Sequence, residues 1–123
     1  MSQSQQTTIG YVSTLKNEPG ELKFTVLLTR DAQTTSVVNR GYIVAVVAEH
    51  GQTVYGVIVE KQYSGNDVRL IDVLKKRGIK PDVSNVAADV YVICHVKQKK
   101  VRIPYGSPVW LATNEELQQH FRS

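Results

Sequence analysis

The sequence has very little cysteine and no long apolar run. Among its 123 residues Cys94 is the one cysteine, which excludes an internal disulfide and a cysteine-based metal cluster. Because Cys94 lies inside an apolar stretch, we interpret it as a buried structural thiol and not as a nucleophile. No apolar stretch approaches the roughly 20 residues that span a bilayer, and the polar first residues do not resemble a cleavable signal. We therefore expect a cytoplasmic protein that does not enter a membrane.

The sequence also lacks motifs for catalysis and cofactor binding. Gly51 and Gly56 have the spacing of a phosphate-binding loop, but Val57 and Ile58 replace the required lysine and hydroxyl residue. The three histidines are scattered without metal-ligand spacing, and no serine lies in a nucleophile elbow. The acidic pairs, Asp67 with Asp72 and Glu115 with Glu116, are explained more simply as helix caps or solvated faces than as catalytic groups. We therefore predict no catalytic residue, no cofactor and no metal site in this chain.

A net charge of +4 is compatible with a nucleic-acid or acidic partner but requires neither. Eight of the basic residues form two clusters. The first cluster is Lys75, Lys76, Arg77 and Lys80, and the second is Lys97, Lys99, Lys100 and Arg102. The second cluster lies near Tyr91 and Tyr105 in the sequence. An exposed basic edge that discourages strand aggregation explains this second cluster most simply, and direct nucleic-acid binding is the alternative.

Residues 41–61 predict a β-hairpin, around which we organise the rest of the chain. Its first arm is dominated by β-branched and small apolar residues, and Gly51 can supply the positive φ of a short hairpin loop. The second arm contains Gly56 in its interior. Because glycine weakens a strand, we expect a bend or a close backbone approach at Gly56.

The other segments predict short strands and two helices. Strands are expected at residues 9–15, 22–29, 87–97 and 109–112, with a short edge strand at Val37 and Val38, whereas residues 79–85 are expected to be a connection. In residues 22–29 Phe24, Val26 and Leu28 share one face. A helix is expected at residues 67–77, capped by Asn66 or Asp67, stopped by Gly78 and using an apolar face of Val68, Leu70, Ile71, Val73 and Leu74.

The chain is expected to end in a helix that begins with a capping box. Thr113 and Glu116 have the spacing of this motif, and the helix should reach about Phe121. The complete pattern predicts a mainly β fold, a small closed antiparallel β-barrel with one short inserted helix and a short C-terminal helix. We assign residues 1–7 to a flexible tail, 8–112 to the barrel and 113–123 to the C-terminal helix.

The order of these segments resembles the HAS-barrel, the N-terminal module of the HerA family of hexameric ATPases, which is similar to the small barrels of rotary ATP synthase subunits. Each matching motif is short, but together they run from about residue 8 to residue 121. They are Ile9-Gly10-Tyr11-Val12, Gly41-Tyr42-Ile43-Val44 with Gly56-Val57-Ile58, the helix at 68–77, the strand at 88–97, and Gly106-Ser107-Pro108-Val109 with Glu115-Glu116-Leu117.

The resemblance implies a part in a DNA translocase that works with a NurA-type nuclease in DNA end processing. The barrel would then help to hold a hexamer together and offer a docking face to the nuclease, while DNA would be engaged by the whole complex. The ATPase core would follow residues 113–123, since its motifs are not in this sequence. The chain is expected to be a piece of such an ATPase or a free-standing barrel, and alone it can be a monomer because an interface of a few kcal/mol can be lost.

For the ring or docking interface we nominate the loop at residues 30–40, the helix at 67–77 and Trp110. A lone tryptophan is more often a core residue, so a place in the core is the alternative to an interface role for Trp110. The charged candidates are Arg30, Arg40, Arg69 and Lys76. For the alternative function, direct nucleic-acid binding, Lys97, Lys99, Lys100 and Arg102 would contact phosphates while Tyr91 or Tyr105 stacked on bases.

Overall fold

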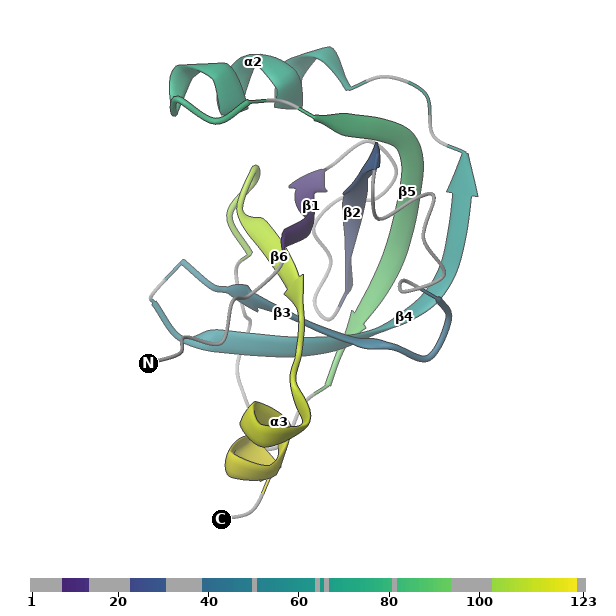
Figure 1. Cartoon of the computed structure of the whole chain (residues 1–123), viewed down its shortest axis with the longest axis vertical. Helices are drawn as coiled ribbons and strands as arrows, with labels where there is room; N and C mark the ends of the chain where they lie inside the picture. Colours follow the sequence, from purple (N-terminus) through teal and green to yellow (C-terminus); the bar gives the residue numbers. More distant parts are fainter. Residues whose placement is uncertain are drawn as a thin grey trace.

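Six antiparallel strands close into a barrel in the computed structural model of the protein (Figure 1). The structure describes residues 8–13, 23–30, 39–49, 51–63, 65, 67–80, 82–93 and 103–121, with only the backbone for residues 120 and 121. Neighbouring strands follow the order β1-β2-β5-β4-β3-β6, and β6 pairs with β1 to complete the ring. The predicted mainly β barrel is therefore confirmed. The strands are β1 (Thr8–Ser13), β2 (Lys23–Thr29), β3 (Ile43–Val47), β4 (Thr53–Tyr63), β5 (Val83–Val92) and β6 (Pro108–Leu111).

The central hairpin is formed as the sequence predicts. Strands β3 and β4 pair in register from Ile43 opposite Val57 to Val47 opposite Thr53. Gly51 has a φ of +90° in the connecting loop, where its N–H donates to the carbonyl of Ala48 at 2.9 Å. A left-handed φ of this kind is easily reached only by glycine, so Gly51 allows the chain to reverse.

Gly56 marks a close approach of two strands. A Cβ atom at this position would lie 2.5 Å from Val90 Cγ1 and 2.9 Å from the carbonyl oxygen of Tyr91. Neither distance is compatible with a side chain, because part of the obstruction is backbone of β5. The absence of a side chain at Gly56 therefore lets β4 and β5 pack closely at this position.

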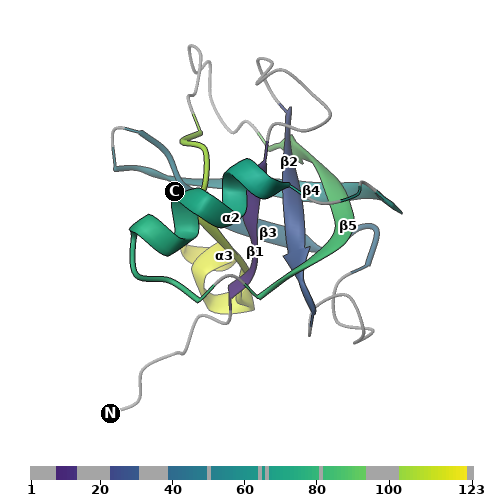
Figure 2. The same cartoon turned by 90° about the horizontal axis from the view of Figure 1, so that it is seen from above.

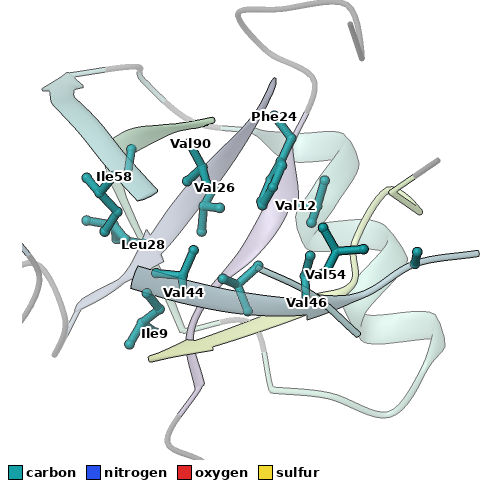
Figure 3. Packing of buried hydrophobic residues seen from close by; sticks show 13 residues of the cluster. Ile9, Val12, Phe24, Val26, Leu28, Val44, Val46, Val54, Ile58 and Val90 are labelled. Carbon is teal, nitrogen blue, oxygen red and sulfur yellow. The ribbon is translucent and has the colours of Figure 1, made fainter. Parts of the chain in front are cut away.

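The barrel interior is filled by apolar side chains from all six strands (Figure 3). The predicted alternation in β2 is confirmed, because Phe24, Val26 and Leu28 all belong to this interior cluster. None of its thirteen members carries a hydrogen-bonding side chain, so these residues form a packed core and not a polar pocket. They are Ile9, Val12, Phe24, Val26, Leu28, Val44, Val46, Ala48, Val54, Ile58, Ala88, Val90 and Val109.

The inserted helix α2 (Val68–Lys76) covers the outside of the barrel, and in the view of Figure 2 it crosses in front of β1. Leu70 and Leu74 are fully buried against Leu27 of β2 and Ala87 of β5. The helix and its cap at Asp67 are confirmed, but part of the predicted apolar face is wrong. Val68 is 73% exposed, because the first turn directs it away from the strands.

A second helix, α3 (Asn114–Phe121), packs on another part of the barrel exterior (Figure 1). The predicted capping box is present: Glu116 N–H donates to Thr113 Oγ1 at 3.1 Å, and Thr113 N–H donates to Glu116 Oε1 at 2.9 Å. The Tyr55 hydroxyl also donates to Glu116 Oε2 at 3.1 Å. Leu117 packs on the small cluster that contains Tyr55 and Trp110, so a helix of about two turns is stabilised by tertiary contacts.

One prediction about the strands needs correction. Residues 79–85 are not all connection, because β5 begins at Val83, which lies opposite Thr29 of β2. The second face of β2 is largely buried as well: Leu27 lies under α2, and Thr25 is only 1% exposed. Pairing with β2 makes Val83 a strand residue, and packing of α2 buries Leu27, so elements distant in sequence determine both environments. The edge strand predicted at Val37 and Val38 lies outside the described residues.

Candidate docking surfaces

Asp67 connects three parts of the chain at the start of α2. The side chain is 4% exposed, and its Oδ1 accepts a hydrogen bond from Leu70 N–H at 3.0 Å while its Oδ2 accepts one from Ser13 Oγ at 2.8 Å. The Tyr105 hydroxyl lies 3.2 Å from both carboxylate oxygens and donates to them. Burial raises the pKa of Tyr105 to about 12, and the negative charge of Asp67 contributes in the same direction. These contacts fix the start of α2 to β1 and to the segment before β6.

The other end of α2 is fixed as well. Arg77 Nη1 donates to the carbonyl oxygen of Gly106 at 3.3 Å, and Gly106 N–H donates to the carbonyl of Val12 at 2.9 Å. Ile79 N–H donates to the carbonyl of Leu74 at 2.9 Å just after the helix. Helix α2 is thus attached at both ends and along its buried side, which makes it a rigid support for the residues on its outward side.

The structure brings Arg69 and Lys76, two of the nominated interface residues, onto this outward side. Both are exposed, and seven residues, or about two turns, separate them along the helix. Lys76 Nζ lies 3.3 Å from Asp72 Oδ2, an exposed pair that is worth about 0.3–0.5 kcal/mol. Lys75 is also exposed. The outward side of α2 is therefore predominantly cationic.

The other nominated cations lie away from the middle of α2. Arg30 follows β2, and its Nε lies 3.6 Å from Asp82 Oδ1 in the segment that leads from α2 to β5. Arg40 is exposed in the turn before β3, where the next residue, Gly41, donates its N–H to the carbonyl of Ile58 at 2.8 Å. Arg40 therefore lies beside β4 and not with Arg30.

Trp110 is a core residue of the small cluster under α3. It is 7% exposed and packs with Ala45, Tyr55 and Leu117. A partner would reach it only if α3 were displaced. Within the described part of the chain its Nε1 is buried without a hydrogen-bond partner. Trp110 is therefore a core residue, which is the alternative to an interface role that the sequence left open.

The strand register reveals a surface that the sequence reasoning did not nominate. Tyr91 of β5 lies directly opposite Lys23 of β2 on one side and Val57 of β4 on the other, and Val57 lies opposite Ile43 of β3. We call these four residues the outer row. Tyr91 is 49% exposed and Val57 is half-buried, so apolar and aromatic surface is accessible there. Neighbouring residues of a strand point to opposite faces, so the buried Val90 leaves Tyr91 on the outer face.

Among the predicted nucleic-acid residues, Tyr91 and Tyr105 belong to the part of the chain that the structure describes. Lys97, Lys99, Lys100 and Arg102 lie outside the described residues, so their role stays a prediction. Of the two tyrosines proposed to stack on bases, Tyr105 has its hydroxyl bound to Asp67 and is partly buried. Tyr91 remains exposed. However, Asp89, two residues before Tyr91 in β5, lies opposite Glu60, three residues after Val57 in β4, and their negative charges would oppose a phosphate backbone.

The described residues contain no group of three or more histidine, cysteine, aspartate or glutamate side chains arranged to hold a metal ion.

The segment from Gly51 to Gly56, which has the glycine spacing of a phosphate-binding loop, is followed by strand and not by helix, because Gly56 lies inside β4. Asp89 accepts from Gln62 Nε2 at 3.0 Å through Oδ2, while its Oδ1 is buried without a partner in the part of the chain that the structure describes. None of the described helices has the length and apolarity to cross a membrane.

Comparison with known proteins finds no protein-family model and no curated protein that matches this sequence.

Proposed function

We propose that this chain is a non-catalytic barrel that serves in assembly and partner docking. Two features support this proposal: the barrel interior is occupied by apolar side chains, and the outer row presents Tyr91 and Val57 to solvent. The accessible aromatic surface on a rigid sheet is the observation that carries it. Tyrosine is enriched in protein interfaces, where its ring is buried and its hydroxyl stays hydrogen-bonded.

The outer row has the composition of a small docking site. Tyr91, Val57 and Ile43 supply apolar surface, while exposed Lys23 and Glu60 supply charges of both signs at its border. Protein interfaces combine an apolar centre with a polar rim in this way. Arg40, beside β4, is a further candidate for the rim.

In the proposed biological setting the barrel belongs to a HerA-like DNA translocase. Its partners are other copies of the barrel in a hexamer and a NurA-type nuclease that acts on DNA ends. The closed antiparallel barrel, the inserted helix and the C-terminal helix agree with the architecture that this resemblance implies. Arg69 and Lys76 do not belong to the outer row. They lie on the outward side of α2, whose ligand is considered in the next subsection.

A pull-down of a NurA-type nuclease by the isolated barrel tests the docking proposal. Tyr91→Ala removes the exposed aromatic ring and should weaken capture about 30-fold, the effect of losing about 2 kcal/mol at a hot spot. Tyr63→Ala is a matched control, because Tyr63 is 72% exposed and lies outside the outer row. Equal loss with both variants, or no capture by the unaltered barrel, would contradict the proposed docking function.

A further inference from the structure

We propose that the outward side of α2 binds the phosphate backbone of duplex DNA, through residues other than those of the outer row and other than Lys97, Lys99, Lys100 and Arg102. Five cationic residues occur between positions 69 and 80, and all are exposed. Asp72 is the one acidic residue within α2, since the capping Asp67 precedes the helix and is buried. The cations are Arg69, Lys75, Lys76, Arg77 and Lys80.

The composition of this surface favours a polyanion over a protein partner. Val68, at the first position of α2, is its only strongly exposed large apolar residue, and α2 contains no aromatic residue. The centres of protein interfaces are depleted in lysine and enriched in aromatic side chains. Phosphate backbones, in contrast, are bound mainly through lysine and arginine without an apolar centre.

The position of α2 suits the dimensions of a duplex. Arg69 and Lys76 are about 10 Å apart along the helix axis, which is long enough to meet several phosphates, because duplex DNA carries one charge per roughly 1.7 Å of its axis. The helix does not need to become ordered on binding, since Asp67 and Arg77 attach its two ends to the barrel. The cations are therefore held on a fixed scaffold that loses little backbone freedom in the complex.

Asp72 opposes this binding and gives the proposal a distinctive signature. Its carboxylate lies between the cations and forms an ion pair with Lys76 at 3.3 Å. A neutral side chain of the same size at this position would remove the repulsion of phosphate and release Lys76 to bind it. Asp72→Asn should therefore raise the affinity for DNA about twofold or more, although the substitution adds no apolar surface.

The test is a titration of the full chain with a labelled DNA duplex at several salt concentrations. For the unaltered protein the logarithm of the affinity should fall linearly with the logarithm of the salt concentration. Lys75→Gln combined with Lys76→Gln should weaken binding about tenfold at low salt. The same variant should make the slope shallower by about 2, corresponding to two lost phosphate contacts.

A control with the same loss of charge is Lys23→Gln combined with Arg40→Gln, because both residues are exposed and neither belongs to α2. It should keep most of the affinity and the slope. An equal effect of the two double variants, or the absence of salt-dependent binding, would overturn the proposal. So would tighter binding of poly-glutamate than of the duplex through the same lysines, which would identify an acidic protein surface as the ligand. Docking through Tyr91 is independent, and Tyr91→Ala should leave DNA binding unchanged.

Discussion

The Tyr105 hydroxyl is hydrogen-bonded to the carboxylate of Asp67, 3.2 Å from each of its oxygens. The two residues are 38 positions apart, and their contact joins the start of α2 to the segment before β6. Ser13 brings β1 into the same network. One buried carboxylate therefore holds the helix, the first strand and the entry to the last strand together.

Stability should fall at strongly alkaline pH because burial and the contact with Asp67 oppose ionisation of Tyr105 in the folded protein. An unfolded tyrosine ionises near pH 10, whereas the pKa of Tyr105 is raised to about 12 in the folded protein, mainly by burial. Above pH 10 the unfolded chain thus binds fewer protons than the folded one, so the free energy of unfolding decreases as pH rises towards 12. Urea unfolding at about pH 8 to 11.5 should show a flatter decline for Tyr105→Phe.

The Tyr55 hydroxyl should contribute to the same decline, because burial and its hydrogen bond to Glu116 raise its pKa to about 12. A double Tyr55→Phe, Tyr105→Phe variant should have the flattest profile, with lower stability near neutral pH from the lost hydrogen bonds. An unchanged pH profile in the double variant would contradict this assignment.

Asp67→Ala should destabilise the fold by about 1–3 kcal/mol. The substitution removes the helix cap and leaves the hydroxyl of the partly buried Tyr105 without its acceptor. Urea unfolding followed by far-UV circular dichroism measures the change. Asp72→Ala is the control on the same helix, because Asp72 is exposed, and its effect should stay within about 0.5 kcal/mol. Similar effects of both substitutions would argue against a structural role for the Asp67 network.

Gly56→Ala should cost about 1–3 kcal/mol, since the new Cβ would press on Val90 and on the backbone of Tyr91. Gly51→Ala provides the comparison: its Cβ would meet no atom within 4 Å, and only its φ of +90° opposes the change. We expect the loss to be about 1 kcal/mol there. Thermal or urea unfolding of both variants tests the order, and a smaller loss at Gly56 would contradict the close approach of β4 and β5.

Trp110, the only tryptophan, reports on the attachment of α3. Because it is 7% exposed, its fluorescence should be blue-shifted and poorly quenched by iodide. Leu117→Ala removes part of the cover and should shift the emission to the red and increase quenching. Gln118→Ala, at an exposed position of the same helix, should leave the spectrum unchanged. A Leu117→Ala spectrum identical to that of the unaltered protein would mean that α3 does not shield Trp110.

Local sequence signals were sufficient for most of the fold. The turn glycine Gly51, the cap at Asp67 and the capping box at Thr113 act through neighbouring residues, and each was recognised from a short segment. Val83 and Val68 were misassigned because distant partners determine their environments. The pairing with β2 makes Val83 a strand residue, and the orientation of α2 on the barrel leaves Val68 in solvent.

The candidate surfaces were harder to predict than the fold. Arg69 and Lys76 could be placed together in advance because a helix has a fixed period. The outer row could not, since Lys23, Tyr91 and Val57 come from three strands and meet only in the final register. No short segment of the sequence contains that information.

The pairing of β1 with β6 has a consequence for the order of folding. These strands stand at opposite ends of the barrel sequence, yet they are hydrogen-bonded neighbours. During synthesis the ring stays open until Pro108–Leu111 have left the ribosome. Until then one edge of β1 and one edge of β3 lack their shared partner, β6. A nascent chain that stalls before this point would expose two unpaired strand edges to chaperones and to aggregation.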